Sequence, residues 1–264
     1  MSLSKKDKQG LAFIALAVVA VICLAAVKFS SSDKKKADEF GCVGPSNLST
    51  VIVLDHSEKM TEQTQNEITA RALKYVNEHV ETNERVTVFN ITETSKKALT
   101  PVFSLCKPKR NGNRLTEAVA AMEKKYKRNF VDPLTQALST KPTDSKESPL
   151  AQALIDVSLT QYLRGEKNSL LIFSDMLEHM PGKFSMYPPQ ACRDQASTVR
   201  SYRESRKGAI ERPTFKNTTV QLNIVPRTDV ARSVINCRDQ LWPWFFGDNE
   251  GKASGMTPDF LPGL

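Results

Sequence analysis

The sequence predicts an α/β protein: a mostly parallel sheet with helices on both faces, preceded by one N-terminal transmembrane helix. Three observations lead to this fold class. Strand-like and helix-like segments alternate from residue 40 onward, the strand-like segments are apolar along their whole length, and an uncharged apolar run lies near the N-terminus. Strands buried on both faces form continuous hydrophobic runs, and their alternation with helices is typical of a parallel sheet.

The apolar run at 11–27 contains seventeen residues without a charge. As a helix rising about 1.5 Å per residue it is roughly 26 Å long, near the lower limit for crossing a bilayer core. Because the long side chain of Lys28 extends this reach, we expect residues 1–10 to form an N-terminal cytoplasmic segment and 11–28 a transmembrane signal anchor. A cleaved signal peptide is the competing interpretation, but its apolar region is usually shorter and ends in a better cleavage site than the LAA at 24–26.

Cysteine usage indicates the compartment of the rest of the chain. Lysines flank the apolar run on both sides, so the positive-inside rule does not settle its orientation. Outside this run the cysteines are even in number and show no CxxC spacing: Cys42, Cys106, Cys192 and Cys237. Two disulfides in an oxidising compartment suit this pattern, and free thiols in a cytosolic domain are the alternative. The sequence thus predicts a single-pass membrane protein whose domain is extracytoplasmic, either periplasmic or extracellular.

Composition divides the remainder of the chain into three parts. Residues 29–41 are polar and are expected to form a tether, 42–246 hold the alternating segments and form the domain, and 247–264 form a loose C-terminal tail rich in Gly, Pro and polar residues. Within the domain, strands are predicted where β-branched and aromatic residues form apolar runs, at 50–55, 85–91, 98–105, 169–174 and 220–225. A short polar turn separates the second of these strands from the third, which predicts that the two are antiparallel.

Helices are predicted between these strands, where apolar residues recur at helical spacing, at 61–80, 115–138, 148–163, 190–207 and 228–237. The second helix is expected to be interrupted at Pro133. The third helix begins with Ser148 and Pro149, which are preferred at the N-cap and at the first helical position. An aromatic cluster at 242–246 is expected to pack the end of the chain onto the body of the domain.

Carboxylates follow the two most hydrophobic strands. Asp55 comes directly after the run VIVL and opens the sequence DHSEK at 55–59, and Asp175 follows LLIFS. In open parallel sheets, ligand-binding groups gather at the carboxyl ends of strands near the point where the strand order reverses. These two residues are therefore candidates for a functional site.

This arrangement resembles the metal-ion-dependent adhesion site of von Willebrand factor A (VWA) domains. In that family, D-x-S-x-S ends the first strand, a Thr or Ser opens a later helix, and an Asp follows the next long strand. The sequence at 55–59, Ser148 and Asp175 match these pieces in order and spacing, and the resemblance covers residues 48–240. It implies a VWA-like, Rossmann-like sheet in which the predicted strands lie in the order third, second, first, fourth, fifth.

The resemblance also implies the disulfide pairing. In the VWA topology the first strand begins and the antiparallel third strand ends at the same edge of the sheet, which brings Cys42 near Cys106. Cys192 and Cys237 are then left to join two late helices. We therefore expect the disulfides Cys42–Cys106 and Cys192–Cys237.

The family's site binds a divalent cation, which captures an acidic group of a partner protein. Mg²⁺ or another hard divalent cation prefers carboxylate, hydroxyl and water oxygens, and the matching ligands are Asp55, Ser57, Ser148 and Asp175. Lys59, however, replaces the second Ser of the motif. Its ammonium group is expected either to replace the metal as the charge-balancing cation or to point into solvent and leave a weakened site. A purely structural role for the two aspartates, as loop anchors and helix caps, is the competing interpretation.

The function predicted from the sequence is a membrane-anchored, VWA-like protein-binding or scaffolding module, and not an enzyme. The chain contains no P-loop, no G-x-G-x-x-G and no G-x-S-x-G motif. Its net charge of +8 falls to +5 when the four Lys and one Asp of residues 1–28 are set aside, which is too mild for specific nucleic-acid binding. The alternative is a metal-dependent hydrolase or phosphoryl-transfer enzyme using Asp55 and Asp175, for which only His56 or His179 offers a base.

Overall fold

The structure is a computed structural model, and the chain divides into two units, Met1–Ala37 and Asp38–Leu264. The residues that the structure describes are 13–23, 37–57, 59–92, 99–110, 118–142, 145–188, 192–247 and 252–257. Within the first unit, 13–23 is helical. Of the helices in the described ranges, none has the length and apolar character that a membrane span requires. The rest of the expected anchor, the cytoplasmic segment and most of the tether lie outside these ranges.

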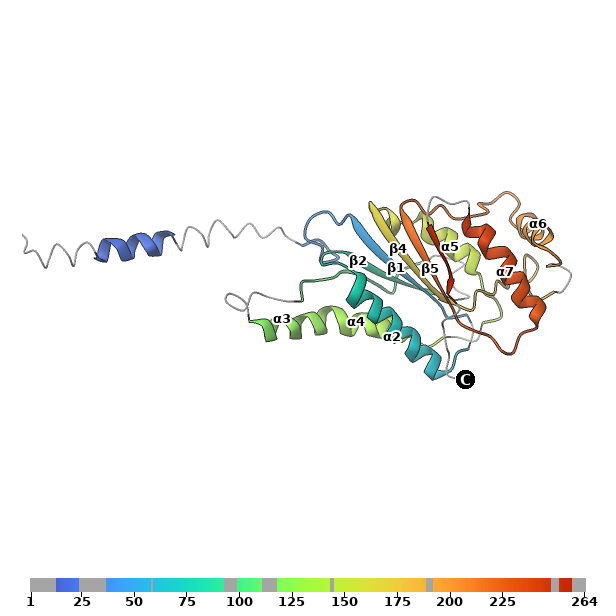
Figure 1. The fold of residues 1–264 in the computed structure, drawn as a ribbon, viewed down its shortest axis with the longest axis horizontal. Helices are drawn as coiled ribbons and strands as arrows, with labels where there is room; N and C mark the ends of the chain where they lie inside the picture. Colours follow the sequence, from blue (N-terminus) through green and yellow to red (C-terminus); the bar gives the residue numbers. More distant parts are fainter. Residues whose placement is uncertain are drawn as a thin grey trace, which may run out of the picture. The chain divides into compact units, whose positions relative to one another are not determined.

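The second unit is built on a six-stranded sheet in the order β3-β2-β1-β4-β5-β6 (Figure 1). The strands are β1 Leu48–Asp55, β2 Arg85–Ile91, β3 Phe103–Cys106, β4 Lys167–Ser174, β5 Thr218–Ile224 and β6 Lys252–Thr257. All neighbouring strands are parallel except β2 and β3. The α/β class, the order of the first five strands and the antiparallel third strand agree with the expectations from the sequence. The third strand is shorter than expected, since it begins only at Phe103.

The expectation of a loose tail at 247–264 is wrong for residues 252–257, which form β6 at the edge of the sheet. This strand pairs in parallel with β5, with a register shift between Val220 and Leu222. Its sequence, KASGMT, lacks the apolar run by which the other strands were recognised. The pairing therefore depends on the backbone of β5 being available, which no local pattern reveals.

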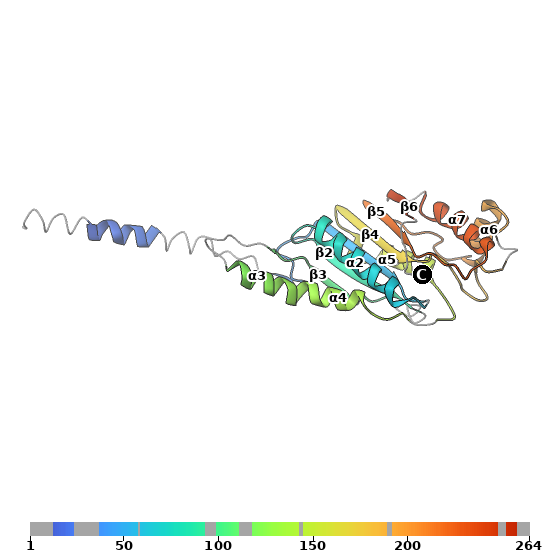
Figure 2. The same cartoon turned by 60° about the horizontal axis from the view of Figure 1, so that its bottom comes forward.

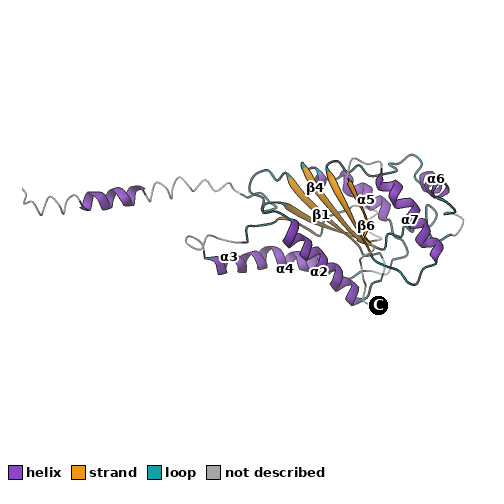
Figure 3. Ribbon diagram, viewed as in Figure 1, coloured by secondary structure: helices purple, strands orange, loops and turns teal. Residues whose placement is uncertain are grey.

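Helices cover both faces of the sheet (Figures 2 and 3). They are α2 Glu62–His79, α3 Val119–Tyr126, α4 Asp132–Leu138, α5 Leu150–Leu159, α6 Gln195–Ser205 and α7 Arg232–Gly247. A π-helical turn at Lys127–Val131 joins α3 to α4, and a 3-10 turn at Gln161–Leu163 follows α5. The interruption expected at Pro133 takes the form of this π-helical turn. The run continues as α4 because the proline lies in the first turn of that helix, where its missing N–H costs little.

The core lies in two layers, one on each side of the sheet. Val51 and Val53 of β1 face the layer that contains residues of α5 and α7, whereas Ile52 and Leu54 face the layer that contains residues of α2 and α4. All four side chains are buried. Burial on both faces is what the continuous apolar run of β1 predicted.

Helix α7 is longer than the sequence predicted. It continues past Cys237 to Gly247 and contains Pro243 in its interior. Proline removes one helical hydrogen bond, and burial of Trp242 and Phe245 at this end of the helix offsets the loss. The indole Nε1 of Trp242 donates a hydrogen bond of 2.6 Å to the carbonyl of Met176, which ties α7 to the turn after β4.

Both expected disulfides are present. Cys42–Cys106 joins the segment before β1 to the end of β3, with Cα atoms 5.1 Å apart. Cys192–Cys237 joins the segment before α6 to α7, with Cα atoms 5.0 Å apart. Each closes a loop of several tens of residues, so each bridge is expected to stabilise the fold by roughly 4 kcal/mol through the entropy of the unfolded chain.

Candidate functional site

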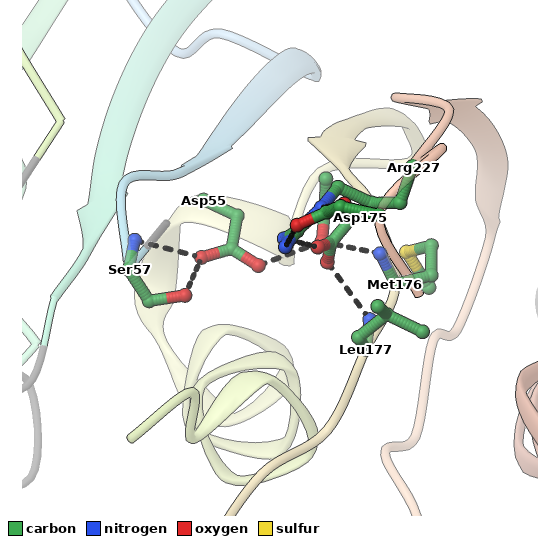
Figure 4. A network of polar contacts seen from close by, with 8 residues as sticks. Asp55, Ser57, Asp175, Met176, Leu177 and Arg227 are labelled. Atoms are coloured by element: carbon green, nitrogen blue, oxygen red, sulfur yellow. Dashed lines mark hydrogen bonds and ion pairs between the residues drawn. The ribbon is translucent and has the colours of Figure 1, made fainter. Parts of the chain in front are cut away.

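The carboxyl ends of β1 and β4 bring the predicted aspartates to one edge of the sheet. The parallel register pairs Leu54 with Phe173, so Asp55 and Ser174 follow at neighbouring positions. The hydroxyl of Ser174 donates a hydrogen bond of 2.7 Å to Oδ2 of Asp55. Only 2% of Asp55 and 5% of Asp175 is exposed to solvent. The two carboxylates are therefore buried groups held at the ends of adjacent central strands (Figure 4).

Asp55 is bound on both carboxylate oxygens. While Ser174 occupies Oδ2, Oδ1 accepts hydrogen bonds from the backbone N–H of Ser57 at 3.1 Å and from its hydroxyl at 2.6 Å (Figure 4). Asp55 and Ser57, both candidate ligands, thus contact each other directly, with the serine donating to the aspartate. This closes the turn after β1.

Asp175 shapes the turn after β4. Its Oδ1 accepts a hydrogen bond of 2.9 Å from the backbone N–H of Leu177, and Ser174 Oγ accepts one of 2.8 Å from Met176 N–H. Met176 has φ of 62°, in the left-handed region that bulky residues rarely adopt. Such a conformation costs about 1–3 kcal/mol, and these hydrogen bonds, with that of Trp242, hold it in place.

Arg227 completes the site, and the sequence analysis did not identify it. Its Nη1 atom lies 2.8 Å from Oδ2 of Asp175, while Nε and Nη2 each lie 2.7 Å from one carboxylate oxygen of Asp229 (Figure 4 shows the contact with Asp175). The hydrogen bonds from Arg227 lower the pKa of the Asp229 carboxyl below its usual value. A signal was available: Arg227 lies just beyond β5, which is parallel to β4 and so ends at the same edge of the sheet.

Lys59 lies at the same place. Its side chain is exposed, and it lines a cavity of about 20 Å³ together with residues of the three strand ends: Asp55, Met60, Asp175, Val225 and Arg227. A volume of this size holds about one water molecule. Two carboxylates and two cationic side chains thus surround one small void. We call Asp55, Ser57, Lys59, Asp175 and Arg227 the strand-end cluster.

Ser148 does not cap helix α5 as the sequence predicted. Helix α5 begins at Leu150. In its first turn, the backbone N–H of Ala151 donates a hydrogen bond of 2.7 Å to Oε2 of Glu178. The hydroxyl of Ser148 is buried and has no hydrogen-bond partner in the described part of the chain. Its backbone instead pairs with His179 through N–H···O bonds of 2.8 and 3.1 Å. The N-cap expectation is therefore wrong, because the carboxyl group of Glu178, from the loop after β4, accepts the hydrogen bond at that position.

Glu178 is a second residue that the sequence analysis missed. It is 4% exposed and lines a cavity of about 230 Å³ that Tyr202 and Arg206 also line. Burial, and next to it the negative charge of Asp55, raise the pKa of Glu178 to about 8, although the N–H of Ala151 acts in the opposite direction. No sequence pattern marks this residue, because its environment is formed by α5 and α6.

His56 and His179, the two histidines considered as catalytic bases, are placed differently from each other. His56 is buried, and this burial lowers the pKa of its imidazole although Asp55 acts to raise it. His179 Nδ1 lies 2.8 Å from the hydroxyl of Ser185, a contact within the loop after β4. Burial therefore favours the neutral form of His56, and His179 helps to hold its own loop.

The cluster as it stands does not fit a divalent cation. Such an ion takes six or more oxygen ligands, but Asp55 accepts hydrogen bonds on both oxygens and Asp175 pairs with the guanidinium of Arg227. No group of three or more His, Cys, Asp or Glu side chains in the described ranges is placed to hold a metal. The guanidinium of Arg227 already places a positive charge beside Asp175, where a divalent ion would have to bind.

Comparison with known proteins adds little to this geometry. No family model and no curated protein matches the chain. Matches among solved structures comprise 35 chains. One of them is the human COPII-coat protein Sec24c, with 12% sequence identity and a TM-score of 0.36, over 80% of this chain and 30% of that chain. The chain thus spans less than a third of that protein's length, and a likeness at this level supports no conclusion about function. What the fold defines is the class: an α/β domain with a mostly parallel sheet.

Proposed function

We propose that this chain is a VWA-like protein-binding or scaffolding module that holds a partner protein at a membrane. The observation that carries the proposal is the meeting of Asp55, Ser57 and Asp175 at the carboxyl edge of β1 and β4. In open α/β sheets this edge is where ligand-binding groups gather. The strand-end cluster is then the centre of the docking surface.

The size of the cavity favours binding over catalysis. A catalytic site needs a pocket that encloses the substrate next to a base or nucleophile. The cavity at the cluster has a volume of about 20 Å³, room for one water molecule. A partner protein can dock on such a surface with one or two side chains, whereas a hydrolase or phosphoryl-transfer substrate has no space within it.

The proposed location rests on two features of the chain. The apolar run at 11–27 approaches the length that a bilayer span needs, and the part of it at 13–23 is helical. The two disulfides suit an oxidising compartment. We therefore propose an anchored module whose domain is periplasmic or extracellular, with the tether giving the docking surface some reach from the membrane.

The VWA resemblance would have the partner offer an acidic residue to Mg²⁺ or another divalent ion. Of the four ligands that this mode requires, Asp55, Ser57 and Asp175 converge, whereas Ser148 makes no hydrogen bond to them within the described ranges. Arg227 further opposes the ion through its pairing with Asp175. The proposed docking surface does not depend on a metal.

Site-specific photo-crosslinking in the native host tests this proposal. A crosslinking amino acid replaces Gln63, an exposed residue in the first turn of α2 four positions after Lys59, or Lys216, an exposed residue just before the N-terminal end of β5. We expect a discrete protein adduct from position 63 and none from position 216.

A second substitution connects the adduct to the cluster. Asp175→Asn should abolish the adduct at position 63, because it removes the charge that holds Arg227. The matched control Asp239→Asn changes an exposed aspartate on α7 that pairs with Arg238, and should leave the adduct intact. The same adduct from both crosslinking positions, or an adduct that survives Asp175→Asn, would contradict the proposed surface.

A further inference from the structure

We infer that Arg227 is the built-in cation of the strand-end cluster, so that the cluster docks its partner without a divalent ion and through a basic side chain of that partner. The inference about the partner rests on the proposed function; the inference about the cation does not.

The geometry around Arg227 is that of a fixed group. Its guanidinium binds Asp175 with Nη1 and grips both oxygens of Asp229 with Nε and Nη2, all at 2.7–2.8 Å. Two-point contacts of this kind match the planar fork of arginine and hold its orientation. The side chain of Arg227 is only 18% exposed and that of Asp175 only 5%. A metal ion approaching Oδ2 of Asp175 therefore has to displace a largely buried ion pair.

The charges of the cluster lead to the same conclusion. Three carboxylates, of Asp55, Asp175 and Asp229, face two cations, of Lys59 and Arg227. An added divalent ion would stand within a few ångströms of both cations, where like charges repel strongly in a partly buried site. Arg227 and Lys59 together already supply the two positive charges that a divalent ion would bring.

The same balance determines the kind of group that docks. Without a metal there is no open coordination position for a carboxylate, and an acidic side chain of the partner would become a fourth carboxylate beside three. These three carboxylates and two cations carry one excess negative charge. The Asp229 side chain, which is 65% exposed, is the carboxylate most open to a partner. A basic side chain of the partner, drawn by this excess negative charge, is therefore the suitable occupant.

Arg227 and Lys59 differ in their exposure to solvent. The sequence pointed to Lys59, because it replaces a serine of the motif, but Lys59 is an exposed side chain at the rim of the cavity. Arg227 comes from a different strand end and makes charged hydrogen bonds on two sides. We therefore assign the metal-replacing role to Arg227, with Lys59 adding a second positive charge.

Metal titration of the purified full chain tests the assignment without any partner. Mn²⁺ binding is followed by loss of its free electron paramagnetic resonance signal, Mg²⁺ binding by calorimetry, and stability by the Tm with and without EDTA. We expect the wild type to show no saturable binding and an unchanged Tm. Saturable binding of Mn²⁺ to the wild type that Asp55→Asn abolishes would overturn the inference.

Variants of Arg227 test the converse, that removing its positive charge allows a metal ion to bind. Arg227→Met should lower the Tm in EDTA and recover several degrees in millimolar Mn²⁺, because the uncovered Asp175 then has room for an ion; Lys59→Ser in addition should increase the recovery. Arg227→Lys keeps a cation and should stay indifferent to Mn²⁺. The control Arg203→Met removes an exposed ion pair with Glu211 on another part of the surface, and its Tm should not respond to metal.

A folded Arg227→Met protein whose Tm does not change with Mn²⁺ would show that Arg227 does not stand in the place of an ion. If Arg227→Met does not fold, the wild-type titration decides alone.

Crosslinking with EDTA and with added salt tests how the partner docks. The adduct formed from position 63 should be unchanged by EDTA and weakened by salt, since it depends on charge and not on a metal. An adduct that EDTA abolishes would overturn the inference and leave the proposed function standing. Absence of any adduct would remove the proposed function while the metal titrations keep their meaning.

Discussion

Replacing Glu178 by Gln should make the protein more stable at alkaline pH and change it little at acidic pH. Glu178 is buried and accepts the hydrogen bond of the Ala151 N–H at the start of α5. A glutamine side chain keeps an oxygen for this bond but cannot ionise. The substitution therefore removes the titration of residue 178 and retains the cap.

The direction follows from the pKa of Glu178, which burial raises from 4.5 to about 8. Between these values the folded protein keeps a proton that the unfolded chain releases, so the free energy of unfolding falls as the pH rises through this window. Above pH 8 the full difference, roughly 5 kcal/mol, has been lost from the wild type. Below pH 4.5 both states are protonated and no such loss applies.

Urea unfolding at pH 5, 7 and 9 measures the effect. The difference in unfolding free energy between Glu178→Gln and the wild type should be small at pH 5 and grow to several kcal/mol at pH 9, on the order of 10 °C in Tm for a domain of this size. Glu204→Gln, an exposed glutamate on α6, serves as control and should follow the wild type. Parallel profiles for the wild type and Glu178→Gln would refute the reasoning, because Glu178 would then not hold the extra proton.

Three further predictions concern the parts of the fold that hold the site. Replacing Cys192 and Cys237 together by Ser should lower the free energy of unfolding by roughly 4 kcal/mol in urea, and an unchanged midpoint would contradict the bridge. Trp242→Ala should cost about 3–5 kcal/mol, since the indole is fully buried and hydrogen bonded; Trp242→Phe, which keeps most of the volume, should cost clearly less. Ser174→Ala should cost about 1–3 kcal/mol because it removes two hydrogen bonds at the strand-end cluster. Ser148→Ala is the matched control and should be neutral or stabilising, since that hydroxyl has no partner in the described ranges; equal losses in the two serine variants would argue against the described hydrogen bonds.

The strands that the sequence predicted are those whose burial on both faces requires a continuous run of apolar residues. The run VIVLD of β1 is apolar without alternation because Val51 and Val53 face one core layer and Ile52 and Leu54 the other. The positions of Asp55 and Asp175 follow from the same feature, since each residue comes directly after such a run. Residues 252–257 have no such run, and their pairing with β5 was therefore not predictable from local sequence.

The partners of the two aspartates were not predictable from local sequence alone, because they come from distant parts of the chain. Ser174 binds Asp55 across 119 residues of chain, and Arg227 binds Asp175 across 52. Glu178 likewise caps α5 from 27 residues away, which displaces Ser148 from the position that its local sequence favoured. These contacts depend on which strand ends lie side by side, and that order came only from the resemblance to VWA domains.

The most direct test of the built-in cation is a crystal structure of the protein grown in MnCl2, with an anomalous difference map calculated at the manganese edge. We predict no anomalous peak between Asp55 and Asp175, and Nη1 of Arg227 at hydrogen-bonding distance from Oδ2 of Asp175. A manganese peak bound by the two aspartates, with Arg227 turned away from them, would contradict the metal-free docking site.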